Sequence, residues 1–176
     1  MAHVIFLKGI NVGGHRRLQP SQMAKTLKAF KLINIGAAGT FIALGNHPSE
    51  SLRQAIQANA PFLLELMMCE ANELLQIWAT NPFTGWAENK QLVPFVSVMA
   101  QANTQPVETP FFVPNEDDWK VKVLKIQHRF VFGIYKREMK ALAALSQLEK
   151  MLQTSLTTRN RNTFQKIIYI LETEGQ

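Results

Sequence analysis

Short apolar segments alternate with amphipathic segments along the first part of the chain. Four apolar segments, bounded by glycine, proline or polar residues, predict four strands at residues 2–7, 33–35, 40–44 and 62–69. Two amphipathic segments between them predict two helices, one opened by Pro20 and one capped by Ser49 or Ser51. The resulting order, βαββαβ, is that of the ferredoxin-like split βαβ motif.

The rest of the chain predicts further helices and strands in a less regular order. Helices are expected at residues 70–80, about 138–153 and around 164–171, and strands at 92–100, 110–113, 119–126 and 129–135. The helix at 138–153 carries Leu142, Leu145, Leu148 and Leu152 at helical spacing. We therefore expect an α+β protein. A ferredoxin-like half, residues 1–69, would pack with a second α+β half, residues 70–176, as one compact unit.

The composition is that of a globular protein, with 47% hydrophobic and 18% charged residues among 176. The longest apolar stretch, residues 62–69, contains Glu65 and is too short to span a bilayer. Residues 1–7 lack the charged leader and cleavage site of a signal peptide. The single cysteine, Cys69, is expected to be an inert core thiol. These features favour a cytoplasmic protein without a membrane partner.

Positive charge is concentrated in the first quarter of the chain. Residues 1–49 contain six cations and no acidic residue, so the whole net charge of +6 belongs to them. Such asymmetry indicates an anionic partner, a nucleic acid or another phosphate-bearing ligand, although a modest surplus of charge also aids solubility. The six cations are Lys8, Arg16, Arg17, Lys25, Lys28 and Lys31.

The segment LKGINVGGHRR, residues 7–17, joins the first predicted strand to the first predicted helix. Its glycines would allow successive backbone N–H groups to converge on an anion. The spacing matches neither the P-loop nor the dinucleotide-binding fingerprint. A turn that needs positive φ at the glycines is the alternative interpretation. The candidate ligand-binding residues of this segment are Lys8, Asn11, Gly13, Gly14, Arg16 and Arg17.

A second polar segment, TTRNRNTFQK at residues 157–166, precedes the last predicted helix. A helix cap at Thr158, Asn160 or Asn162 explains several of its polar residues but not the two arginines between them. Arginine has forked donors that suit phosphate or carboxylate. The candidate ligand-binding residues here are Arg159, Asn160 and Arg161.

The two polar segments are expected to face each other as loops of one site, because polar groups on loops are where function usually collects. Asn46, in ALGNH at residues 43–47, is a further candidate, although a plain turn is the favoured interpretation there.

Four motifs carry a resemblance to a known family. They are KGINVGG, TFIALGN, NPF at residues 81–83 and TTRNRNT. The chain resembles the DUF1697 family, bacterial proteins of unknown function, in which these motifs read RGINVGG, TYIQSGN, NPF and TxRNWNT. The resemblance implies a ferredoxin-like α+β fold and brings no activity. The chain departs from the family at Ala43-Leu44, where the family has Gln-Ser, and at Arg161, where it has Trp, so a ligand site at these positions would be altered or lost.

The sequence indicates no metal site, no cofactor and no catalytic residue. The four histidines, His3, His15, His47 and His128, lie far apart and outside any zinc-binding spacing, and no nucleophile motif occurs. The aromatic residues of RFVFGIY, residues 129–135, do not match an RNA-binding motif and are expected in the core.

Three functions are open at this point. The leading hypothesis is a module that binds an anionic ligand through the basic N-terminal face. The first alternative is an enzyme acting on a phosphorylated small molecule in a pocket lined by Asn11, Arg159 and Asn160. The second alternative is a subunit-association domain without a ligand. An open basic surface favours the first, a deep cleft the second, and a large exposed apolar face the third.

Overall fold

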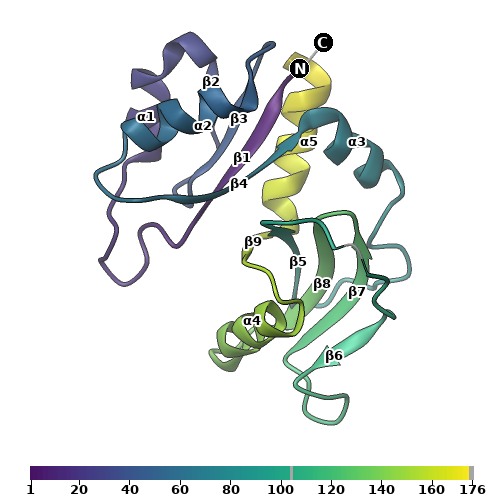
Figure 1. Cartoon of the computed structure of the whole chain (residues 1–176). Helices are drawn as coiled ribbons and strands as arrows, with labels where there is room; N and C mark the ends of the chain where they lie inside the picture. Colours follow the sequence, from purple (N-terminus) through teal and green to yellow (C-terminus); the bar gives the residue numbers. More distant parts are fainter. Residues whose placement is uncertain (104, 175–176) are drawn as a thin grey trace. The chain divides into compact units, whose positions relative to one another are not determined.

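The computed structural model describes residues 1–103 and 105–174. Over these residues it contains two antiparallel sheets and five α-helices, so the predicted α+β class is confirmed (Figure 1). The chain divides into two compact units. The N-terminal unit comprises Met1–Gln76 together with the C-terminal segment that begins at Gln165, and the second unit comprises Ile77–Phe164. The predicted packing of two halves into one unit stays a prediction.

The N-terminal unit is built on a four-stranded sheet with strand order β2-β3-β1-β4, in which neighbouring strands are antiparallel. In chain order its elements are β1 (His3–Lys8), α1 (Pro20–Thr26), a 3₁₀ turn (Lys28–Phe30), β2 (Leu32–Asn34), β3 (Thr40–Ala43), α2 (Ser49–Ala58) and β4 (Glu65–Glu70). This is the predicted order of strands and helices. The helix α3 (Ala71–Ala79) follows β4 directly.

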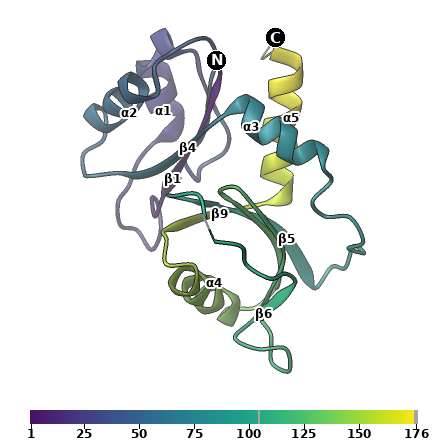
Figure 2. The ribbon, with the colours of Figure 1, turned by 45° about the vertical axis from the view of Figure 1, so that its right-hand side comes forward.

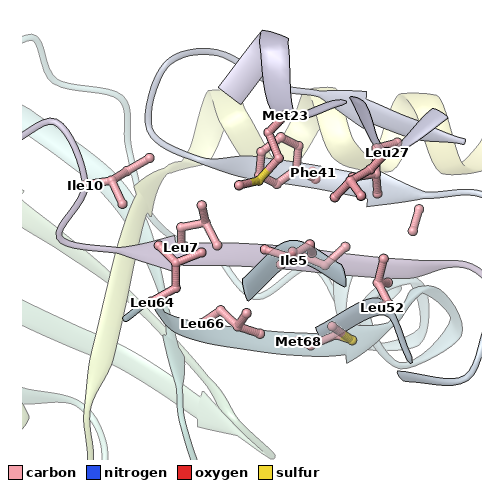
Figure 3. Packing of buried hydrophobic residues seen from close by; sticks show 13 residues of the cluster. Ile5, Leu7, Ile10, Met23, Leu27, Phe41, Leu52, Leu64, Leu66 and Met68 are labelled. Carbon is pink, nitrogen blue, oxygen red and sulfur yellow. The ribbon is translucent and has the colours of Figure 1, made fainter. Parts of the chain in front are cut away.

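The core of the N-terminal unit joins α1 and α2 to one face of the sheet (Figure 3). Ile5 and Leu7 share that face of β1, as the two-residue period of a strand requires. Each such side chain contributes about 1.5–3 kcal/mol on burial. The other buried residues of this cluster include Met23 from α1, Leu27 directly after it, Leu52 and Ile56 from α2, Phe41 from β3, and Leu66 and Met68 from β4. Cys69, the single cysteine of the sequence, is also buried, as expected of a core thiol.

The start of α2 differs from the prediction. The N-cap is Pro48, which makes no side-chain hydrogen bond, and Ser49 is already the first residue of the helix. The prediction of a cap at Ser49 or Ser51 was therefore wrong. The reason is the backbone of Pro48, which is fixed at φ −59° and extended at ψ 132°, so that the change of direction occurs one residue earlier.

The second unit is built on a five-stranded antiparallel sheet with strand order β6-β7-β8-β5-β9 (Figure 1). Its two edge strands, β6 and β9, are labelled in Figure 2. Its elements are β5 (Leu92–Met99), β6 (Phe111–Val113), β7 (Val121–Gln127), β8 (Phe130–Lys136), α4 (Lys140–Met151) and β9 (Leu156–Asn160), and α5 (Arg161–Glu174) begins at its end. The predicted hairpin is present as β7 and β8. It turns beside His128, whose φ of 51° is in the left-handed region.

Of the four leucines that the sequence places at helical spacing, Leu145, Leu148 and Leu152 pack in or against the core of this unit, and α4 adds small residues beside them. Ala141, Ala144 and Leu148 are its buried residues, whereas Leu142 is 72% exposed. Successive residues of a helix point about 100° apart, so the turn of α4 that buries Ala141 directs Leu142 away from the sheet. Ala144 and Leu148 belong to the core cluster of this unit together with Phe95 and Val131.

The strand β9 was not predicted, since residues 157–160 were expected to form a polar loop. They pair with β5 in antiparallel register, with Thr157 opposite Val98 and Thr158 opposite Ser97. The hydroxyl oxygens of Ser97 and Thr158 lie 2.6 Å apart and share a hydrogen bond. Threonine is β-branched and favours strands, and this hydrogen bond satisfies its hydroxyl inside the sheet. The expectation that TRNRNT is a loop was therefore wrong.

Candidate functional site

The segment between β1 and α1 is a tightly folded loop. Gly13 and Gly14 have φ values of 58° and 78°, and Asn11 and Arg16 also adopt positive φ, at 57° and 49°. The backbone N–H of Asn11 donates to the carbonyl of Arg16 at 3.2 Å. This left-handed backbone is what the two glycines permit without steric cost. The geometry is that of the predicted turn.

Asn11 fixes this loop with its side chain. Its Nδ2 donates to the carbonyls of Leu18, at 2.9 Å, and Ala37, at 3.2 Å, while its Oδ1 accepts the N–H of Leu18 at 2.9 Å. Both donors of the amide and one acceptor position are thus used within the protein. Asn11 ties the loop to the turn between β2 and β3 and holds the backbone in place beside the exposed cations.

The two arginines of the loop are held in different ways. The Nη2 of Arg16 donates to the carbonyl of Leu63 at 2.7 Å, and its guanidinium lies 5.3 Å from the ring centroid of Phe62, within the range of a cation–π contact. The Nε of Arg17 donates to the carbonyl of Gly14 at 3.2 Å. Both side chains remain exposed, so the loop presents two positioned guanidinium groups to solvent.

A hollow of about 390 Å³ lies along the loop. It is lined by Asn11, Gly14, Arg17, Leu18 and Gln19, so three of the predicted residues surround one concavity. Leu18 and Gln19 were not predicted, because an apolar residue and a neutral amide before a helix carry no signal for ligand binding. This volume is at the lower end of the range for small-molecule sites.

Lys8 and Asn46 occupy different surroundings from the loop arginines. Lys8 ends β1 directly opposite Glu65 of β4, so an acidic residue faces it across the strands. Asn46 accepts a hydrogen bond at 2.8 Å from the N-terminal ammonium of Met1. It therefore lies beside the start of β1, whereas the loop begins at the end of that strand.

Asn160 caps α5. Its Oδ1 accepts hydrogen bonds from the backbone N–H of Thr163 at 2.9 Å and from the Thr163 hydroxyl at 3.0 Å. This is the geometry of an N-cap, so the capping interpretation is confirmed for Asn160. The cap fixes where β9 ends and where the helix begins.

Arg159 lies in β9 opposite Val96 and is half-buried. Its Nη1 donates to the Thr157 hydroxyl at 2.9 Å and to the Thr158 carbonyl at 3.0 Å. Burial disfavours the charged guanidinium and lowers the pKa of Arg159 to about 10. The group is still cationic at neutral pH, and its contacts hold it along its own strand.

Arg161, the first residue of α5, is held between aromatic rings. Its guanidinium lies 5.1 Å from the ring centroid of Trp86 and 5.9 Å from that of Phe83, and its Nη2 forms an ion pair with the Glu88 carboxylate. Its Nε is buried without a hydrogen-bond partner among the described residues. Arg161 is thus a positioned cation with donor capacity left over.

The structure therefore places the predicted residues other than Lys8 and Asn46 in two settings. Asn11, Gly13, Gly14, Arg16 and Arg17 form one loop of the N-terminal unit, and Arg159, Asn160 and Arg161 join β9 to α5 at the end of the second unit. The expectation that the two segments face each other stays a prediction. The part of the chain that the structure describes contains no cluster of three or more His, Cys, Asp or Glu side chains able to hold a metal. None of its helices is long and apolar enough to cross a membrane.

The family of proteins of unknown function called DUF1697 matches residues 1–126. The chain belongs to this family. The match includes the loop of residues 7–17 and the NPF motif, whereas the TTRNRNT segment of the DUF1697 resemblance lies beyond it. No curated protein matches the chain.

A solved structure supports the fold of this DUF1697 protein. The conserved bacterial protein SP0830 from Streptococcus pneumoniae has 14% sequence identity to the chain, with a TM-score of 0.61. The alignment covers 97% of this chain and 98% of that protein. At this identity the likeness concerns the fold alone.

Proposed function

We propose that this protein is a module that binds a phosphate-bearing ligand, with single-stranded nucleic acid as the favoured class, on the basic surface of its N-terminal unit. We define this basic surface as residues 9–31, which comprise the loop of residues 9–19, α1, the 3₁₀ turn and Lys31 directly after that turn. The observation that carries the proposal is the absence of any acidic residue from positions 1–49, combined with the exposure of five of the six cations there.

The exposed cations of the basic surface are available to a ligand. Lys25, Lys28 and Lys31 form no ion pair within the described residues and carry full charges into solvent. Arg17 adds a guanidinium at the hollow. Cations clustered without compensating acids are the electrostatic basis of phosphate-backbone binding.

The loop supports the proposal through its rigidity. Asn11 and the left-handed glycines fix the backbone, so the arginines do not need to be ordered by a ligand. A pre-ordered surface loses less conformational entropy on binding. The strand order β2-β3-β1-β4 with antiparallel neighbours supports a ferredoxin-like arrangement for the sheet of this unit.

Fluorescence anisotropy with a short single-stranded oligonucleotide tests the proposal. If the five exposed cations contact phosphates, the slope of log K against log salt approaches about −3.5, and fewer contacts give a proportionally shallower slope. Replacing Lys28 by Gln should weaken binding and reduce the slope by about 0.7, the share of one contact. Lys166→Gln, an exposed cation on α5, is the matched control and should leave both quantities unchanged.

If the oligonucleotide does not bind at low salt, the proposal that this protein binds nucleic acid is wrong. Binding with a slope near zero would show that the contact is not made through phosphates, and equal effects of the two lysine variants would show that it is not localised on the basic surface.

A further inference from the structure

Two hollows that share walls lie at the start of α5 in the second unit. Their volumes are about 350 and 340 Å³. Both are lined by Leu92 and Pro94 of β5, by Arg137 after β8, and by Arg161 and Asn162 of α5. We call the larger of the two, which Trp86, Glu88 and Lys90 also line, the concavity, and its volume suits a small molecule.

The charge around this concavity is positive. Lys90, Arg137 and Arg161 line it, against one acidic residue, Glu88. Lys90 and Arg137 are exposed, and within the described residues their side chains make no ion pair or hydrogen bond. The backbone N–H of Arg137 donates to the Gln91 carbonyl at 2.9 Å, which fixes the start of that side chain beside β5.

Polar donors without partners also line the concavity. The Nε of Arg161 and the Nε1 of Trp86 are buried and lack a hydrogen-bond partner among the described residues. The Asn160 cap satisfies the N–H of Thr163, which leaves the N–H groups of Arg161 and Asn162 without acceptors inside the helix. Buried donors are normally satisfied, so unsatisfied ones beside a cationic hollow indicate an acceptor-rich ligand.

We propose that this concavity is a site for a small phosphate monoester, and that the Glu88 carboxylate occupies Arg161 until the ligand displaces it. A carboxylate and a phosphate offer a guanidinium the same kind of acceptor, so the ion pair of Arg161 and Glu88 shows what the arginine is oriented to bind. The Glu88 side chain is 77% exposed and can move into solvent, whereas the Arg161 side chain is only 20% exposed and is held by two rings.

The ligand class follows from the walls of the concavity. Three cations and a helix N-terminus provide more positive charge than one carboxylate requires, and they suit a phosphate dianion. Leu92, Pro94 and Trp86 supply apolar surface on which the organic group of an ester can rest. The residues of the concavity all belong to the second unit, so this inference does not depend on the basic surface of the N-terminal unit.

Isothermal titration calorimetry at constant ionic strength tests the site, with phenyl phosphate and inorganic phosphate as probes. We expect phenyl phosphate to bind with a stoichiometry of one, and more tightly than inorganic phosphate. Arg161→Ala and Arg137→Ala should each weaken binding by roughly tenfold or more, as expected when a charge-assisted hydrogen bond is lost. Glu88→Gln should strengthen binding several-fold, because it removes the competing carboxylate. Lys166→Gln, on the same helix, should have no effect.

Several outcomes would overturn the inference. The inference is wrong if phenyl phosphate does not bind the parent protein. It is also wrong if the Arg137→Ala variant binds phenyl phosphate with unchanged affinity, since this exposed side chain can be removed without disturbing the core. Binding weakened by Glu88→Gln would show that the carboxylate supports the ligand instead of competing with it. If phenyl phosphate binding is lost in Arg17→Ala and retained in Arg161→Ala, the phosphate binds on the basic surface. That outcome contradicts this inference and supports the proposed function.

Discussion

Asn11 is a residue whose side chain serves the loop backbone, although its position in a glycine-rich segment suggested a ligand contact. Its amide bridges the carbonyl and N–H of Leu18 and the carbonyl of Ala37. Replacing Asn11 by Ala should lower the free energy of unfolding by about 1–3 kcal/mol, because backbone groups lose their partners. Positive φ also costs Ala more than Asn.

Urea denaturation monitored by circular dichroism measures this effect. Gln19→Ala, at the same hollow, is the control and should change stability by less than about 0.5 kcal/mol, as is usual for a surface position. Equal stability of the Asn11 and Gln19 variants would contradict the assigned role of Asn11.

His3 makes stability depend on pH. It is buried in β1, its Nδ1 has no hydrogen-bond partner among the described residues, and Glu70, His47 and the N-terminal ammonium face it. Burial lowers the pKa of His3 below its ordinary 6.5, and the Glu70 carboxylate only partly opposes this. Below about pH 6.5 the unfolded chain therefore binds a proton that the folded protein does not, so stability falls as the pH falls.

The comparison of the parent protein with His3→Gln checks this expectation. The free energy of unfolding of the parent should decrease more steeply between pH 7.5 and pH 5 than that of the variant. Parallel pH profiles would show that His3 is not responsible.

At the scale of the elements, Gly133 determines how β8 packs between its neighbours. A Cβ at this position would lie 2.6 Å from the Lys122 carbonyl oxygen and 2.6 Å from the Phe95 ring. Gly133→Ala should therefore destabilise the protein by about 1–3 kcal/mol, the usual cost of overpacking. Thermal unfolding measures it, and adding Phe95→Leu should recover part of the loss by relieving one of the two contacts. Additive losses in the double variant would contradict this explanation.

The elements that sequence patterns predicted well are those buried on a regular period. β1, β5 and β8 have nearly continuous apolar or aromatic segments, and β7 has apolar residues interrupted by Lys122 and Lys125. The helix α5 carries Phe164 and Leu171 on its buried side. β9 escaped prediction because its polar side chains, Thr157 and Thr158 among them, are satisfied by hydrogen bonds that only the folded sheet provides. Leu142 belongs to the predicted stripe of leucines but is exposed, because apolar spacing alone does not show which face of a helix meets the sheet.

The candidate site was predictable only in part. The glycine-rich loop and its arginines were predictable because the composition changes directly after an apolar strand. The Asn160 cap was predictable because a polar residue precedes an amphipathic segment. Lys90 and Arg137 were not, because neither belongs to a glycine-rich loop or a polar motif. The pairing of β5 with β8 and β9 brings them to Arg161. Side-chain neighbours set by long-range strand pairing leave no local signal.

At the scale of the whole molecule, the charge is segregated. The N-terminal unit presents cations from an acid-free stretch of the chain, and the second unit holds a separate cationic concavity at the start of α5. A nucleic-acid backbone binds to positive charge that is spread over a surface, whereas a small phosphate ester binds in a concavity. The two proposals are therefore separable by the position at which each ligand perturbs the protein.

The most direct test of the central claim is a ¹H–¹⁵N correlation NMR titration of the whole chain with a short single-stranded oligonucleotide at low salt. The amide shifts of residues 9–19 and 25–31 should change in a saturable way, and added salt should reverse the changes. Unperturbed amides in these residues at saturating oligonucleotide, or changes confined to residues 86–94 and 160–162, would contradict the assignment of the basic surface as the binding face.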